Sequence, residues 1–133
     1  MKTKMKSKIK SPSKKYVDGF VIPIKKKDVA AYKKMAEWGA KTWKSYGALE
    51  YFECIGDDLK VMQGAGQGFA KLAQLKKDET VVFSWIVYKS KAHRDQVNKK
   101  VMSDSSMNNF DSSKMPFDMK RFAVGGFKPI VEA

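Results

Sequence analysis

Five polar side chains in an otherwise apolar, strand-rich sequence are the strongest candidates for a functional site. Asp18 stands in an apolar strand, and a buried carboxylate needs a partner, for which Arg121 is the natural candidate. His93 lies near a helix N-terminus, where imidazole stays neutral and could exchange a proton with a ligand. Tyr51 and Ser84 would line the wall of the same pocket, in which Asp18 and Arg121 orient a polar group of a small ligand.

Each of these residues also has a purely structural interpretation. Asp18 and Arg121 could form an ion pair of the core, and His93 could be a surface or capping histidine. Cys54 stands in the middle of a strand, where a cysteine is more often a small core residue than a nucleophile. With one histidine and one cysteine in the chain, a histidine-rich metal site is excluded, and no cofactor is expected. Asp57 and Asp58 fit a turn better than a metal site.

Four strands and two helices must position these side chains. Alternating β-branched and aromatic residues predict strands over residues 16–24, 48–56, 80–88 and 121–131. Apolar residues at helical spacing predict one helix from Val29, with Asp28 as its N-cap and Gly47 at its end, and a second from the cap Ser90 to about Met102. A flexible glycine loop over 64–68 and a helical turn over 69–75 follow the second strand. The pair Gly125-Gly126 suggests a bulge or bend in the last strand.

The order β, α, β, β, α, β predicts an α+β, ferredoxin-like fold with a four-stranded antiparallel sheet. The strand over 80–88 is apolar on both faces, so both faces should be buried. Two helices cover only one face, and a second copy of the chain is the simplest cover for the other. We therefore expect a homodimer that forms a dimeric α/β barrel, in which Phe52 and Phe83 pack as core residues rather than stack on RNA bases.

Lysine dominates the charge of the chain. The 133 residues include 27 basic and 14 acidic side chains, which gives a formal net charge of +13. Residues 1–15 hold seven lysines and no acid, and we expect them to form a disordered basic extension to a single domain over 16–133. Only Arg94 and Arg121 are arginines, the type preferred for bidentate contacts to phosphate and guanine. Nucleic acid is therefore not the expected partner.

The sequence also predicts where the protein resides. It has no apolar run of 18 residues, so neither a transmembrane helix nor membrane association is expected. A single cysteine and the lack of a secretory hydrophobic region predict a cytosolic protein.

Many blocks of the sequence, in order, resemble one family. They include Tyr-Val-Asp-Gly-Phe-Val-Ile-Pro at 16–23, Gly-Ala-Leu-Glu-Tyr at 47–51, Thr-Val-Val-Phe-Ser-Trp-Ile-Val-Tyr-Lys-Ser at 80–90, Ala-His-Arg-Asp at 92–95 and Met-Pro-Phe-Asp at 115–118. This pattern is similar to that of the YbaA-like family of small bacterial proteins, known as domain of unknown function 1428. The resemblance covers residues 16–133 and implies a dimeric α/β barrel, but no established activity and no catalytic residue.

Three hypotheses for the function follow. The first is a homodimer that binds a small apolar or aromatic ligand in a pocket between sheet and helices. The second is a cofactor-independent, monooxygenase-like enzyme, by analogy with related barrel superfamilies. The third is an RNA-associated protein that uses the lysine-rich tail, whose binding would weaken steeply with salt.

Overall fold

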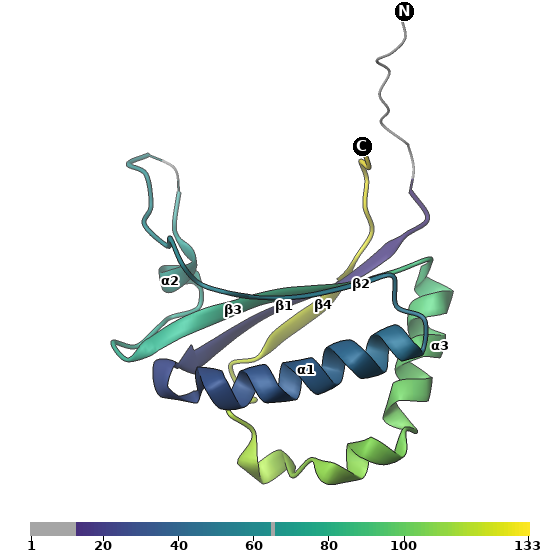
Figure 1. Ribbon diagram of the computed structural model, residues 1–133. Helices are drawn as coiled ribbons and strands as arrows, with labels where there is room; N and C mark the ends of the chain where they lie inside the picture. Colours follow the sequence, from purple (N-terminus) through teal and green to yellow (C-terminus); the bar gives the residue numbers. More distant parts are fainter. Residues whose placement is uncertain (1–12, 65) are drawn as a thin grey trace, which may run out of the picture.

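A four-stranded antiparallel sheet in the order β2-β3-β1-β4 forms the centre of the fold (Figure 1). The computed structural model describes residues 13–64 and 66–133, so most of the predicted basic extension lies outside the described residues. The central strands β1 (Tyr16–Lys25) and β3 (Glu79–Tyr88) pair along their whole length. The shorter strands β2 (Glu50–Ile55) and β4 (Ala123–Phe127) form the two edges. The predicted α+β class and βαββαβ order are confirmed.

The two long helices, α1 (Val29–Ser45) and α3 (Lys91–Met102), lie on the same face of the sheet (Figure 1). The Ser90 hydroxyl accepts a hydrogen bond from the His93 backbone N–H, so the predicted cap of α3 is confirmed. Gly47 adopts a φ of 112° just after α1, as a helix-ending glycine should. Asp28, the last residue of the 3-10 turn η2 (Lys26–Asp28), directly precedes α1, but its side chain accepts no capping hydrogen bond.

Two less regular segments complete the chain. The residues between β2 and β3 contain one helical turn, α2 (Phe69–Leu72), which lies on the face opposite to α1 (Figure 1). The segment 103–122 contains the 3-10 turns η3 (Ser105–Asn109) and η4 (Ser112–Lys114). It returns on the same side of the sheet as the long helices before it enters β4 (Figure 1).

The buried core lies between the sheet and the two long helices. One cluster joins Ile22, Ile24 and Val82 of the sheet to the buried face of α1. A second cluster joins Ile86 and Tyr88 to the buried face of α3. Strand alternation therefore turns residues 16, 18, 20, 22 and 24 of β1 toward the helices, and their register partners on β3 with them.

Asp18 is buried on this helix side, but its predicted partner is wrong. The carboxylate pairs with Arg94 of α3, with 2.6 Å between Oδ1 and Nη1, and not with Arg121. Arg94 also contacts the exposed Asp95 and lies over the ring of Tyr16, 4.8 Å from its centre. An ion pair was expected at Asp18, and it forms with the arginine that α3 brings to this end of the sheet.

The last strand is shorter than predicted and contains no bulge. The pairing of β4 with β1 runs without interruption from Ala123 to Phe127, through both glycines. Gly126 is required for a different reason, because a Cβ at this position would collide with the ring of Tyr16. Gly126 therefore allows the ring of Tyr16 to pack closely against β4.

The second face of the sheet is apolar and largely uncovered within the chain. Phe52, Phe83 and Phe127 point to it and are 48%, 45% and 60% exposed. Cys54 lies on the same face and is exposed, so the prediction that it is a small core residue is wrong. The expected core packing of Phe52 and Phe83 is likewise absent within one chain, because α2 covers only part of this face.

Candidate functional site

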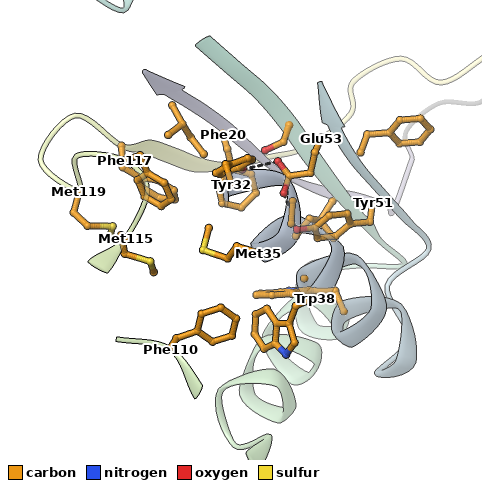
Figure 2. Close-up of a pocket in the computed structure, with 18 of the residues that line it drawn as sticks. Phe20, Tyr32, Met35, Trp38, Tyr51, Glu53, Phe110, Met115, Phe117 and Met119 are labelled. Carbon is orange, nitrogen blue, oxygen red and sulfur yellow. Dashed lines mark hydrogen bonds between the residues drawn. The ribbon is translucent and has the colours of Figure 1, made fainter. Parts of the chain in front are cut away.

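An apolar cavity of about 340 Å³ lies between the sheet, α1 and the segment 103–122 (Figure 2). The wall formed by the sheet consists of Phe20, Ile22, Tyr51, Phe52, Glu53, Ser84 and Ile86. The wall formed by α1 consists of Tyr32, Met35, Ala36, Trp38, Gly39 and Trp43. The cover consists of Met102 at the end of α3 and, from the segment 103–122, of Met107, Phe110, Met115, Phe117, Met119 and Phe122. The volume is within the range of small-molecule sites, ~300–1,000 Å³.

A single carboxylate, that of Glu53, faces this apolar cavity. Tyr32 donates a hydrogen bond to Oε1 at 2.6 Å, and Tyr51 donates one to Oε2 at 2.7 Å (Figure 2). The pocket lining includes no lysine, arginine or histidine among the described residues. Each carboxylate oxygen has a second lone pair, so Glu53 can accept further hydrogen bonds from a molecule in the cavity.

The two tyrosines stay protonated and act as donors. Burial raises the pKa of Tyr32 far above its usual value, and the hydrogen bond to Glu53 adds to the effect. Burial also raises the pKa of Tyr51, with the negative charge of Glu53 as the second cause. Both hydroxyls therefore fix the position of the carboxylate at physiological pH and cannot serve as proton acceptors there.

Local sequence patterns bring these groups together. Tyr51 and Glu53 are two residues apart on β2, so they point to the same side of the sheet, and Glu53 is the register partner of Ser84 on β3. On α1, the residues that follow Tyr32 at helical spacing, such as Ala36 and Gly39, line the same cavity. Gly39 leaves room for the Tyr51 hydroxyl, because a Cβ there would collide with it.

Hydrogen bonds at the far end of the pocket hold its aromatic wall. The Trp38 indole donates to Ser106 Oγ at 2.7 Å, and the Trp43 indole donates to Asn98 Oδ1 at 2.9 Å. The ring centres of Trp38 and Phe110 are 4.4 Å apart. Asn98 belongs to α3 and Ser106 to the segment 103–122, so these hydrogen bonds connect the α1 wall of the pocket to α3 and to the cover.

The structure brings together two of the five predicted site residues and separates the other three. Tyr51 and Ser84 line the cavity. Asp18 is neutralised by Arg94 and does not line the cavity. His93 and Arg121 do not line it either, so the predicted polar-group orientation and proton exchange have no geometric basis there.

His93 has a capping role at the start of α3. Its Nδ1 accepts a hydrogen bond from the Lys89 N–H at 3.0 Å. Burial, and secondarily the positive charges of Lys89 and Lys100, lower the pKa of His93 below its usual value. The imidazole is therefore biased to the neutral form, as predicted, and its structural interpretation accounts for its contacts.

Arg121 forms an ion pair with Glu79 at the start of β3. Its Nη1 lies 2.6 Å from Glu79 Oε2, and its Nη2 donates to the carbonyl oxygen of Gln74 at 2.9 Å. The hydrogen bond from Arg121 lowers the pKa of Glu79 to about 2, and the Lys76 N–H adds to the shift. Arg121 therefore connects the segment 103–122 to the end of the loop that follows α2.

Sequence reasoning missed Glu53 and Tyr32, the two residues that complete the polar end of the pocket. The available signal was a glutamate that shares a strand face with Tyr51 and aliphatic residues. Glu50 and Glu53 lie on opposite faces of β2, so they do not form a pair of carboxylates that would mark the site. The hydrogen bond from Tyr32 depends on the packing of α1 on β2, which strand alternation does not encode.

Two features are absent from the part of the chain that the structure describes. No three His, Cys, Asp or Glu side chains in 13–64 and 66–133 are grouped so that they could hold a metal ion. In the same part of the chain, no helix has the length and apolar character needed to cross a bilayer.

Comparison with known proteins shows the family of this chain. Residues 15–119 match the family model described as "Protein of unknown function (DUF1428)". The chain is 47% identical to "Uncharacterized protein YbaA" of Escherichia coli strain K12 over 120 residues, which is 89% of this chain and 98% of that protein. The YbaA proteins of Escherichia coli O157:H7 and Shigella flexneri match with the same values. The chain belongs to the DUF1428 family.

Proposed function

We propose that this protein binds a small, mainly apolar or aromatic ligand in the pocket between sheet and α1. The observation that carries the proposal is the lining: aromatic rings and methionine side chains surround a cavity of about 340 Å³ with one carboxylate at its end. A lining of aromatic and aliphatic side chains with few polar groups is typical of small-molecule sites. Methionine is also common at binding surfaces that adapt to several shapes, because its side chain is unbranched and polarisable.

Titration of the protein with the neutral probe 2-phenylethanol, followed by calorimetry, tests this proposal. We expect saturable binding, and we expect Ala36→Phe to abolish it, because this residue of α1 lines the cavity. Ala30→Phe is the matched control, since Ala30 lies on α1 and is exposed. Circular dichroism of both variants reports their folding. Equal affinity for the probe in both folded variants would overturn the proposal.

We further propose that the protein works as a cytosolic homodimer joined through the open face of the sheet. The side chains that point to this face from the middle of the described strands are uncharged, although the chain carries a net charge of +13. Two copies can therefore meet there without opposing like charges. The segment after β2 and the C-terminal residues both rise beside this face (Figure 1) and carry exposed apolar side chains, among them Met62 and Ile130.

Light scattering tests the dimer. We expect about twice the chain mass of 15.1 kDa at micromolar concentration. Phe83→Lys, in the centre of the face, should give a monomer. Met102→Lys is the control, because Met102 is similarly exposed, at 56%, but belongs to α3 on the other side of the sheet. A monomeric unmodified protein would contradict the proposal.

The two alternatives have less support. The RNA hypothesis relies on the lysine-rich tail, most of which lies outside the described residues. Stacking of RNA bases on the open face would use Phe52 and Trp85, whose ring centres are 5.0 Å apart, but the middle of that face has no basic side chain from the described strands to contact phosphate. A monooxygenase-like reaction needs a substrate that the pocket activates. An oxygen-uptake assay over a panel of quinols distinguishes such an enzyme from a binding protein.

A further inference from the structure

The ligand pocket contains a negative charge without a positive partner. Glu53 has two tyrosine donors, Tyr32 and Tyr51, at 2.6 and 2.7 Å, but its carboxylate faces a lining without lysine, arginine or histidine among the described residues. In the same chain, the carboxylates of Asp18 and Glu79 are each paired with an arginine at 2.6 Å. The protein therefore neutralises the buried carboxylates of Asp18 and Glu79 with an arginine, whereas no such partner faces Glu53 among the described residues.

The surroundings of Glu53 favour a cation. Aromatic rings line the cavity, and the face of an aromatic ring attracts an ammonium group. The free lone pairs of Glu53 accept the hydrogen bonds that a protonated amine donates. A carboxylate or phosphate ligand would instead meet a like charge in an apolar environment, which is strongly unfavourable.

We propose that the ligand of this pocket is a small organic cation, an ammonium group carried by an aryl or alkyl body, and that Glu53 binds the ammonium group. The inference rests on the proposed function, since it names the ligand class of the same cavity. The apolar body would lie against the methionine and aromatic side chains of α1 and the segment 103–122 (Figure 2). The charged end would lie at the β2 end of the pocket, within reach of the carboxylate.

Three probes with the same phenyl ring test the charge preference: 2-phenylethylammonium, 2-phenylethanol and 3-phenylpropanoate. Hydrogen bonds to charged groups are strong enough for the ammonium probe to bind roughly ten- to a hundredfold more tightly than the alcohol. The anionic probe should bind more weakly than the alcohol. These comparisons use the unmodified protein, so they remain decisive even if a variant at Glu53 fails to fold.

A matched pair of variants assigns the preference to one residue. Glu53→Gln should remove the advantage of the ammonium probe over the alcohol. Glu50→Gln, which makes the same change on the same strand but on the opposite face, should keep the full advantage. Retention of the advantage in a folded Glu53→Gln variant would overturn the assignment to Glu53.

The outcomes separate this inference from the proposed function. Equal binding of the ammonium and alcohol probes, lost in Ala36→Phe, would overturn the ligand class and leave the pocket as a binding site. Absence of binding by all three probes at millimolar concentration would overturn both.

Discussion

The ion pair between Glu79 and Arg121 should make the protein lose stability in acid over a defined pH range. The Glu79 side chain is 5% exposed and accepts two hydrogen bonds from Arg121, at 2.6 and 2.9 Å, and one from the Lys76 N–H at 2.8 Å. These donors lower the pKa of Glu79 from 4.5 to about 2 in the folded state. A carboxyl group with a lowered folded-state pKa stabilises the fold above its unfolded pKa and loses this contribution as the pH falls.

The size of the effect follows from linkage. Each tenfold difference in proton affinity between the folded and unfolded states is worth ~1.4 kcal/mol, so the fall of the Glu79 pKa from 4.5 to about 2 corresponds to about 3 kcal/mol. This contribution should be complete above roughly pH 5 and nearly absent at about pH 2. Glu79→Gln should therefore lower the free energy of unfolding by about 2–3 kcal/mol at neutral pH and leave it almost unchanged near pH 2.

Urea unfolding at a series of pH values, followed by tryptophan fluorescence at one protein concentration, measures this difference. Asp78→Asn is the control, because Asp78 is exposed and its side chain makes no hydrogen bond to another described residue. We expect the control to follow the unmodified protein at every pH. A Glu79→Gln variant as stable as the unmodified protein at neutral pH, or a difference that persists undiminished at pH 2, would refute the reasoning.

Two further predictions use matched pairs of variants, with urea unfolding as the measurement for both. Arg94→Met should destabilise the protein by roughly 2–4 kcal/mol because it leaves the buried Asp18 unpaired. Asp95→Asn, at the exposed carboxylate that contacts the same arginine, should cost less than about 0.5 kcal/mol. Equal destabilisation by the two variants would contradict this prediction. Gly126→Ala should destabilise the protein by about 1–3 kcal/mol, because the new Cβ would overpack against the ring of Tyr16. Gly125→Ala, whose new Cβ meets only ordinary van der Waals contacts, should have a much smaller effect. The opposite ranking would show that the Tyr16 ring moves aside.

Much of the fold was predictable because its elements carry regular local patterns. Alternation identified β1 and β3, and the hydroxyl of Ser90 marked the start of α3 within one residue. Alternation also placed Asp18 and Ser84 on one face of the sheet, which the register confirms. These features depend on residues close in sequence, where side-chain period and capping chemistry decide the outcome.

The site was only partly predictable because it depends on contacts between distant segments. The partner of Asp18 is Arg94 rather than Arg121. Arg94 reaches Asp18 because α3 packs beside this end of β1, and that placement depends on the packing of both helices on the sheet. The cavity itself arises where the segment 103–122 returns beneath α1, and no local pattern indicates that return. The role of Glu53 depends partly on such a contact, since its donor Tyr32 comes from α1, although its other donor, Tyr51, lies two residues away on the same strand.

The most direct test of the pocket as the ligand site is NMR of methionine methyl groups during titration with 2-phenylethylammonium. Five methionines line the cavity, namely Met35, Met102, Met107, Met115 and Met119, whereas Met62 is 78% exposed in the loop after β2. We predict saturable shifts of the five pocket methyl signals with one common affinity, and no shift of the Met62 signal. A shift of the Met62 signal with none at the pocket methionines would contradict the account.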